Sequence, residues 1–290
     1  MGKKFQIKTK YTTKDFKKAI SCFTSKTTLH LDTKNIVDQG GHSIIYPAIS
    51  KGGRIFIAKI MYIDEPNTNE LQLILNDGKF SLKANHPSVI KSFAFYELVK
   101  GKCYSIVMQK ASFNLSQAFN HLHSKGILKS DFSNNKNKPS NYLYKYFLNR
   151  ILKSLMYFNS NNWVHLDIKP QNFLLFGNEI KLADFSLSKV VDKSQPFFNL
   201  PFMGTPSYMA PEYYVNNGII KSEFAEKVDI FALGCLFYKM IFNENVIQCN
   251  KNNELYSYND VISDINNTKD KIIKSCLNEE VKDLLLKMLH

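Results

Sequence analysis

The hydrophobic pattern changes character about a third of the way along the chain. From Leu29 to Ile63, short runs rich in β-branched and aromatic residues alternate with glycines, which predicts three antiparallel strands. A helical periodicity follows over residues 69–84, and two more strand-like runs, SFAFYEL and CYSIVMQ, extend to residue 109. These elements predict a small, mainly β region that ends near Met108.

After Met108 the pattern becomes helical. Apolar residues recur every four positions and predict one long helix with a broad buried face; they are Leu143, Phe147, Ile151 and Leu155, with Leu148, Leu152 and Met156 beside them. The apolar run 230–242 predicts a buried core helix, because it contains Lys239 and is shorter than the ~20 residues that span a bilayer. The polar, low-complexity segment 130–141 contains Pro139 and predicts a surface insertion.

Composition supports a globular body with an unusual first segment. The 290 residues are 44% hydrophobic, and 38 basic against 25 acidic side chains give a net charge of +13. Residues 1–26 hold eight lysines against the single acid Asp15, so we interpret residues 1–28 as a basic, solvated N-terminal extension. Binding of RNA or of an acidic membrane surface is the alternative, but the chain contains just two arginines, Arg54 and Arg150, and gives no strong nucleic-acid signal.

The cysteines indicate a reducing compartment. They are five in number, widely spaced and free of any C-x-x-C pair, so neither a disulfide framework nor a zinc site is expected. No signal peptide or transmembrane segment is evident, and we expect an intracellular location, cytoplasmic or nuclear.

The candidate chemistry lies in three motifs that follow the long helix. The first, HLDIKPQN over residues 165–172, places Asn172 five residues after Asp167, so that a carboxylate can accept a hydroxyl proton and a carboxamide can hold a metal ion. The second, ADFSLS, places Asp184 after a strand-like run, as a further ligand for Mg²⁺. The third is GTPSYMAPE, over residues 204–212.

In this order and spacing, the motifs resemble the eukaryotic protein kinase family, serine/threonine type, from about Leu29 to the end of the chain. The resemblance implies an α+β, bilobal protein-kinase-like fold with a β-rich N-lobe over residues 29–108 and a helical C-lobe over residues 109–290. It further implies ATP and Mg²⁺ as cofactors, with ATP in the cleft between the lobes, and protein substrates, with a regulatory protein as a further partner.

The family's catalytic roles transfer to matching residues. Asp167 resembles the catalytic base, Lys169 the cation that offsets the charge of the transferring phosphoryl group, and Asn172 and Asp184 the metal ligands. Lys169 and Thr205 together resemble the serine/threonine branch rather than the tyrosine branch. Asp229, in KVDIFALGC, matches the buried aspartate that holds the backbone of the catalytic loop.

The resemblance also implies a nucleotide site. Lys59, in FIAKI, matches the strand lysine that pairs with a carboxylate on the next helix; Asp77 has the expected spacing, and Glu70 is the alternative. Met108 resembles the gatekeeper, or is simple core packing, with Gln109 and Ala111 offering backbone groups to adenine. The full nucleotide-binding set is Val37, Asp38, Gly40, Gly41, Ser43, Ile45, Ala58, Lys59, Asp77, Met108, Gln109, Ala111, Asn172 and Asp184.

Several positions depart from the family pattern. The glycine-rich loop is degenerate, because Asp38 and Ser43 stand where two of its three glycines would be, so weaker ATP binding is expected. Leu166 replaces the arginine of His-Arg-Asp, and Ser186 replaces the glycine of Asp-Phe-Gly. The chain ends before the arginine that family members pair with Glu212, which predicts a domain truncated before its last helix or a substitute base.

Two other functions and a set of structural readings compete with this assignment. A pseudokinase or scaffold keeps the fold and uses it for binding, whereas a small-molecule kinase shares the Asp and Asn motif but has no use for GTPSYMAPE. Taken alone, each of these residues also has a purely structural interpretation. His165 could be a core histidine, Asp229 a helix cap, Lys59 a surface lysine on a strand and Asn172 a turn residue. Their joint order favours the kinase.

Overall fold

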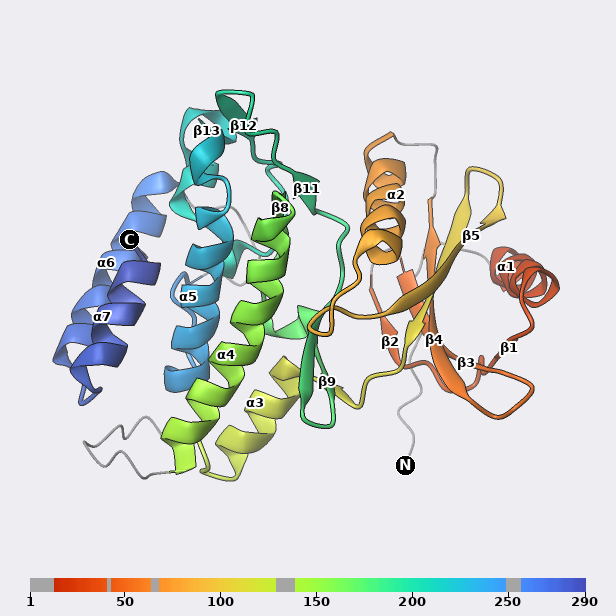
Figure 1. Cartoon of the computed structure of the whole chain (residues 1–290), viewed down its shortest axis with the longest axis horizontal. Helices are drawn as coiled ribbons and strands as arrows, with labels where there is room; N and C mark the ends of the chain where they lie inside the picture. Colours follow the sequence, from red (N-terminus) through yellow and green to blue (C-terminus); the bar gives the residue numbers. More distant parts are fainter. Residues whose placement is uncertain (1–12, 41–42, 64–67, 129–138, 249–256) are drawn as a thin grey trace. The chain divides into compact units, whose positions relative to one another are not determined.

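The computed structural model describes residues 13–40, 43–63, 68–128, 139–248 and 257–290. The chain divides into two compact units, one of residues 1–85 and 90–110 and the other of residues 86–89 and 111–290 (Figure 1). The first is β-rich and the second is mainly helical, as the sequence predicts. The division differs from the predicted one in two respects: the break falls after residue 110 rather than 108, and the segment 86–89 belongs to the helical unit.

The β-rich unit is built on one antiparallel sheet. Its strands are β1 (His30–Leu31), β2 (Asp38–Gln39), β3 (Ser43–Ile49), β4 (Ile55–Tyr62), β5 (Ser92–Val99) and β6 (Cys103–Gln109). They pair in the order β1-β3-β4-β6-β5, and β2 also pairs with β3. The first predicted strand is two short strands, because the carboxylate of Asp32 accepts hydrogen bonds from the Lys34 backbone N–H and the Asn35 amide and forms a turn.

Each face of this sheet is covered by one helix, α1 (Thr13–Lys26) or α2 (Thr68–Lys83) (Figure 1). Side chains of Ile44, Tyr46, Ala58 and Ile60 form one core cluster with Ala19 and Phe23 of α1. On the other face, a second cluster contains Met61, Ile63, Tyr104 and Ile106 with Ile74 of α2. The alternation of side chains along β4 places Ala58 and Lys59 on opposite faces.

The prediction of a solvated N-terminal extension is wrong for residues 18–26. Ala19 and Phe23 are fully buried, and the ammonium group of Lys26 donates a hydrogen bond to the Glu97 carbonyl oxygen. Lysine content alone misleads here because an amphipathic helix carries its charges on the solvent face while its apolar face covers the sheet. Residues 1–12 of that predicted extension lie outside the described residues.

The helical unit contains α3 (Leu115–Ser124), α4 (Pro139–Ser160), α5 (Lys227–Phe242), α6 (Tyr258–Lys274) and α7 (Glu279–Met288). Its short strands are β7 (Phe113–Asn114), β8 (Trp163–Val164), β9 (Phe173–Phe176), β10 (Glu179–Leu182), β11 (Lys189–Val190), β12 (Phe197–Asn199) and β13 (Ile219–Lys221). They form a β10-β9-β7 sheet and the pairs β11-β8 and β12-β13. The predicted core helix is α5, which lies between α4 and α7 (Figure 1).

The long helix α4 departs from its prediction at its start and in the width of its buried face. It begins at Pro139, where proline suits the first helical turn, so residues 139–141 of the predicted insertion are helical and residues 130–138 lie outside the described residues. Phe147, Ile151 and Leu155 are buried as expected, but Met156 is 67% exposed. The predicted apolar face is therefore too broad.

The segment 86–89 joins the helical unit through three contacts. The His86 ring stacks on the Tyr157 ring with centroids 4.7 Å apart, the Ser88 carbonyl oxygen accepts a hydrogen bond from the Leu182 N–H at 2.9 Å, and Val89 forms a parallel bridge with Leu182. These contacts tie the segment to α4 and β10.

We expect Phe23→Ala to destabilise the β-rich unit by about 3–5 kcal/mol, because it removes a fully buried aromatic ring from the sheet cover. Chemical denaturation followed by circular dichroism measures this. Ser21→Ala, on the exposed side of the same helix, is the matched control and should change stability by less than about 0.5 kcal/mol. Equal midpoints for the two variants would contradict packing of α1 on the sheet.

Candidate active site

A buried carboxylate organises the loop that precedes Asp167. The side chain of Asp229, on α5, accepts hydrogen bonds from the backbone N–H groups of His165 at 2.7 Å and Leu166 at 2.9 Å. Burial raises the pKa of Asp229, while these hydrogen bonds oppose the rise. The loop that precedes Asp167 is thus fixed to the core helix of the unit.

Two non-glycine residues near the site adopt left-handed backbone conformations. Leu166 has φ +67° and Asp184 has φ +64°. Such conformations cost roughly 1–3 kcal/mol each and persist where the surroundings enforce them, as the bond from Leu166 to Asp229 does. Ser186, which replaces a family glycine, is not among the described residues with positive φ, so this departure creates no such strain.

Asp167 lies at the centre of a polar network. Its Oδ1 accepts a hydrogen bond from Thr205 Oγ1 at 2.9 Å, and its Oδ2 lies 2.6 Å from Lys169 Nζ and 3.0 Å from Asn172 Nδ2. Lys169 also donates to Thr205 Oγ1 at 2.9 Å. Three residues predicted to share the site with Asp167 therefore all contact its carboxylate, and they hold it in one orientation.

The two predicted metal ligands are adjacent in space. The Ala183 N–H donates to the Asn172 carbonyl oxygen at 2.9 Å, and Asp184 is the next residue. One carboxamide and one carboxylate suit Mg²⁺, which keeps several waters and takes other oxygens from substrate phosphates. No group of three or more His, Cys, Asp or Glu side chains able to hold a metal occurs in the described part of the chain, so a site made of protein ligands alone is not indicated there.

Aromatic packing fixes the segment after Asp184. Phe185 is fully buried, and its ring lies 5.7 Å from the His165 ring and 5.6 Å from the Phe158 ring. His165 Nε2 lies 3.2 Å from the Ala183 carbonyl oxygen, and its Nδ1 accepts from the Asp167 N–H at 3.3 Å. His165 is thus a core histidine that also contacts the backbone of the two motifs that contain Asp167 and Asp184. Ser188 is fully buried, and its hydroxyl donates to the His165 carbonyl oxygen at 3.4 Å.

In the β-rich unit, Lys59 and Asp77 form the ion pair that the sequence predicts. Lys59 Nζ lies 2.8 Å from Asp77 Oδ2, and Ser81 Oγ donates to Asp77 Oδ1 at 3.3 Å. The Asp77 side chain is 3% exposed and that of Lys59 is 14% exposed, so water screens the pair little. The distance is that of a direct ion pair, although aspartate is one methylene shorter than the family's glutamate.

Gly78 explains how the shorter carboxylate reaches Lys59. A Cβ atom at Gly78 would lie 2.7–2.8 Å from three atoms of the Phe95 ring, closer than real contacts allow. The absence of a side chain therefore lets α2 approach the sheet at the residue that follows Asp77. Sequence reasoning missed this glycine, although its position beside the ion-pair aspartate is a readable signal.

The sheet brings several predicted nucleotide-site residues onto one face. Strand register pairs Ile45 with both Lys59 and Asp38, and Ser43 with Met61, so these residues share a side of the sheet. Gly40 precedes β3, and its N–H donates to the Ser43 carbonyl oxygen at 2.8 Å. Val37 is 53% exposed beside them, and Gly41 lies outside the described residues.

The prediction that Ala58 belongs to the nucleotide site is wrong. It is fully buried in the cluster with α1, on the face opposite Lys59, because side chains alternate along a strand. The residue on the face of Lys59 is Ile57, which lies directly opposite Met108 in the β4-β6 register. Counting two residues back from Lys59, rather than one, would have found it.

The predicted hinge residues differ in their surroundings. Met108 packs against the cluster under α2, which accords with its packing role. The Gln109 N–H donates to the Lys91 carbonyl oxygen at 3.0 Å, so it is not available to a ligand. Ala111 is half-buried and is the first residue of the long segment 111–290 of the helical unit.

Glu212 has a buried carboxylate oxygen. Its Oε2 is inaccessible to solvent and accepts no hydrogen bond from any described residue. Leaving such an atom unpaired costs about 1–3 kcal/mol.

Comparison with known proteins identifies the class that this fold and site define. The sequence model of the protein kinase domain matches residues 31–290. The chain belongs to the protein kinase family, and its α+β architecture is that of the family.

The individual relatives are distant protein kinases by name, and two of the three are named as serine/threonine kinases. A candidate serine/threonine-protein kinase of Acanthamoeba polyphaga mimivirus is 26% identical over 250 residues, which cover 77% of this chain and 52% of the relative. A serine/threonine-protein kinase of Dictyostelium discoideum is 28% identical over 245 residues, which cover 83% of this chain and 24% of the relative. The calcium/calmodulin-dependent protein kinase type II of Caenorhabditis briggsae is 25% identical over 226 residues, which cover 72% of this chain and 36% of the relative. The chain thus spans between a quarter and about half of these relatives' lengths.

None of the helices in the described part of the chain combines the length and apolar character required to cross a membrane. The apolar helix α5 is accordingly a core helix, as its burial shows.

Gly78→Ala should lower the free energy of unfolding by about 1–3 kcal/mol, because its Cβ overlaps the Phe95 ring and forces α2 outward. Gly52→Ala is the matched control, since a Cβ there meets nothing within 4 Å, and it should stay within about 0.5 kcal/mol of wild type. Denaturant titration gives both values. Adding Asp77→Glu to Gly78→Ala should cost less than the two single changes summed, because the longer side chain spans the wider gap; simple additivity would contradict the compensation.

Glu212→Gln should leave stability unchanged or raise it by up to about 2 kcal/mol, because it removes the charge from a carboxyl group with a buried, unbonded oxygen. Thermal unfolding of the 290-residue chain measures the change. Glu223→Gln is the exposed control and should be neutral. A marked loss of stability in Glu212→Gln alone would reveal a partner for this carboxylate.

Proposed function

We propose that this protein kinase transfers the γ-phosphate of Mg-ATP to serine or threonine hydroxyls of protein substrates, with Asp167 as the catalytic base. The observation that carries the proposal is the network in which Lys169, Asn172 and Thr205 all contact the Asp167 carboxylate. A carboxylate held in one orientation can accept a hydroxyl proton in line with the transferring group.

The roles of the neighbouring residues follow from their charges. Lys169 places an ammonium group beside the base, where it offsets negative charge on the transferring group. Its bond to Thr205 supports assignment to the serine/threonine branch, as do the names of the relatives. Thr205 in turn fixes the segment GTPSYMAPE against the catalytic loop.

The residues present fit a magnesium nucleotide. Mg²⁺, when bound, neutralises phosphate charge and orients the phosphates for in-line transfer. Asn172 and Asp184 would hold it through oxygen atoms, as the hard cation requires. In the β-rich unit, Lys59 would bind phosphate oxygens while its ion pair with Asp77 keeps the ammonium group in position.

A pseudokinase or scaffold is the second candidate, favoured by Asp38 and Ser43 in the glycine-rich loop. Asp38 is exposed and places negative charge where phosphates would approach. Against it stand the intact Asp167 network and the short Lys59–Asp77 pair. These contacts support transfer rather than binding alone.

The deciding measurement is transfer of labelled γ-phosphate from Mg-ATP to a generic basic protein. Asp167→Asn should reduce the rate by about 10²–10⁴-fold, because it removes the base and keeps the side chain's shape. Asp270→Asn, an exposed aspartate on α6, is the matched control and should retain full activity.

Either failure has a distinct meaning. A folded wild-type chain that binds Mg-ATP but transfers nothing would overturn the proposal in favour of the scaffold. Equal activity of Asp167→Asn and wild type would remove Asp167 from the mechanism. Transfer to a sugar or choline in preference to a peptide would indicate a small-molecule kinase instead.

A further inference from the structure

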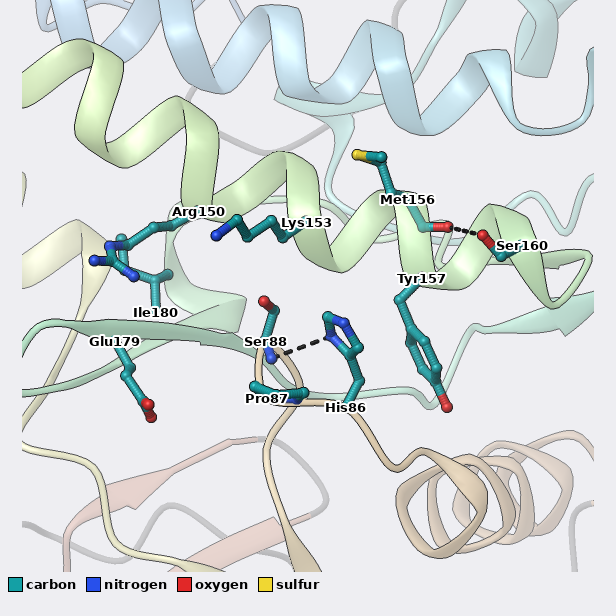
Figure 2. A pocket seen from close by; sticks show the side chains of 10 residues that line it. All are labelled: His86, Pro87, Ser88, Arg150, Lys153, Met156, Tyr157, Ser160, Glu179 and Ile180. Carbon is teal, nitrogen blue, oxygen red and sulfur yellow. Dashed lines mark hydrogen bonds between the residues drawn. The ribbon is translucent and has the colours of Figure 1, made fainter.

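A cavity of about 550 Å³ lies within the helical unit, between α4, the loop 86–88 and the start of β10 (Figure 2). Three segments line it: the loop 86–88, the α4 residues from Arg150 to Ser160, and Glu179 and Ile180 at the start of β10. Its volume is in the range of small-molecule and peptide side-chain pockets. No residue of the proposed catalytic network lines it.

Arg150 is a preorganised cation at one end of this pocket. Its guanidinium lies 4.5 Å from the centre of the Tyr146 ring, and the Tyr146 hydroxyl donates a hydrogen bond to the Asn178 carbonyl oxygen. The cation is thereby fixed against a ring that is itself tied to the turn between β9 and β10. Arg150 Nε is buried and has no hydrogen-bond partner among the described residues, although guanidinium groups normally satisfy such donors.

Lys153 adds a second positive charge one turn away. Figure 2 shows its ammonium end extending toward Arg150 along the pocket. Neither cation forms an ion pair with a carboxylate of the described residues, and the acid at the rim, Glu179, lies 3.1 Å from Lys181. Two neighbouring cations without a counter-charge favour an anion between them.

The other end of the pocket is apolar. Met156, whose side chain is 67% exposed on a helix whose sequence predicts it to be buried, and the exposed Pro87 both line the pocket. The stacked rings of His86 and Tyr157 form the wall between them. A ligand that fills the pocket therefore needs an acidic group beside an apolar one.

We propose that this pocket is a docking site for an acidic peptide segment of a partner protein, in which a glutamate or aspartate side chain pairs with Arg150 and Lys153 and a neighbouring apolar side chain packs on Met156. A guanidinium binds a carboxylate through paired N–H donors, which gives orientation as well as affinity. Single-stranded nucleic acid fits less well, because the Tyr157 ring is already stacked on His86 and is not free to stack on a base.

The test is fluorescence anisotropy of the full chain with a labelled peptide in which glutamates alternate with leucines. A peptide of the same length with glutamine in place of glutamate is the matched probe, and should bind about tenfold more weakly. Arg150→Gln and Lys153→Gln should each weaken binding of the acidic peptide about tenfold, whereas Lys145→Gln, which removes the same charge from an exposed position on α4, should change it less than about twofold. Lys153 is exposed, so its variant keeps the test valid even if Arg150→Gln fails to fold.

The readout is binding, so it does not depend on phosphoryl transfer and can be repeated in Asp167→Asn. Equal binding of the two peptides, or equal loss in Lys145→Gln and Lys153→Gln, would reduce the effect to general attraction by the net positive chain and overturn the proposal. Full displacement by inorganic phosphate would indicate a small-anion site, and stronger binding of oligouridylate than of the acidic peptide would indicate a nucleic-acid site. Either result would overturn peptide docking.

Discussion

The candidate active site depends on one carboxylate buried in the core. Asp229 costs free energy to bury, and its two hydrogen bonds to the backbone of His165 and Leu166 offset that cost. Because Leu166 has an otherwise unfavourable positive φ, the bond to its N–H also sets the direction in which the next residue, Asp167, leaves the loop. The apolar helix α5 therefore does more than fill the core, because it carries the group that fixes the backbone next to Asp167.

Much of the helical unit's site could be predicted from sequence, because its residues lie in short motifs whose chemistry is readable. Asp167 and Asn172 are five residues apart, and the loop between them has room for few arrangements. The long-range contact to Asp229 spans 64 residues and was within reach only through the family resemblance. The fold class followed from the same source together with the change from strand-like to helical periodicity.

The face on which a residue lies was harder to predict than the element to which it belongs. Ala58 was assigned to the ligand side of its strand, yet it is buried under α1, and Met156 was assigned to the core, yet it is exposed. Both errors arise because periodicity defines two or more faces without saying what covers each one. Ala58 is covered by a lysine-rich helix, α1. Its composition predicts a solvated segment, but the buried Phe23 packs it against the sheet.

Departures from a family motif have to be weighed with their neighbours, because geometry rather than residue identity performs the chemistry. Asp77 is one methylene shorter than glutamate, but Gly78 brings its helix close enough for a 2.8 Å ion pair. Ser186 lacks the conformational freedom of glycine, but the positive φ lies two residues earlier, at Asp184. In the glycine-rich loop, by contrast, Asp38 adds charge of the wrong sign for a polyanion. If this chain differs from an ordinary kinase, we therefore expect the difference in nucleotide affinity rather than in the step at Asp167.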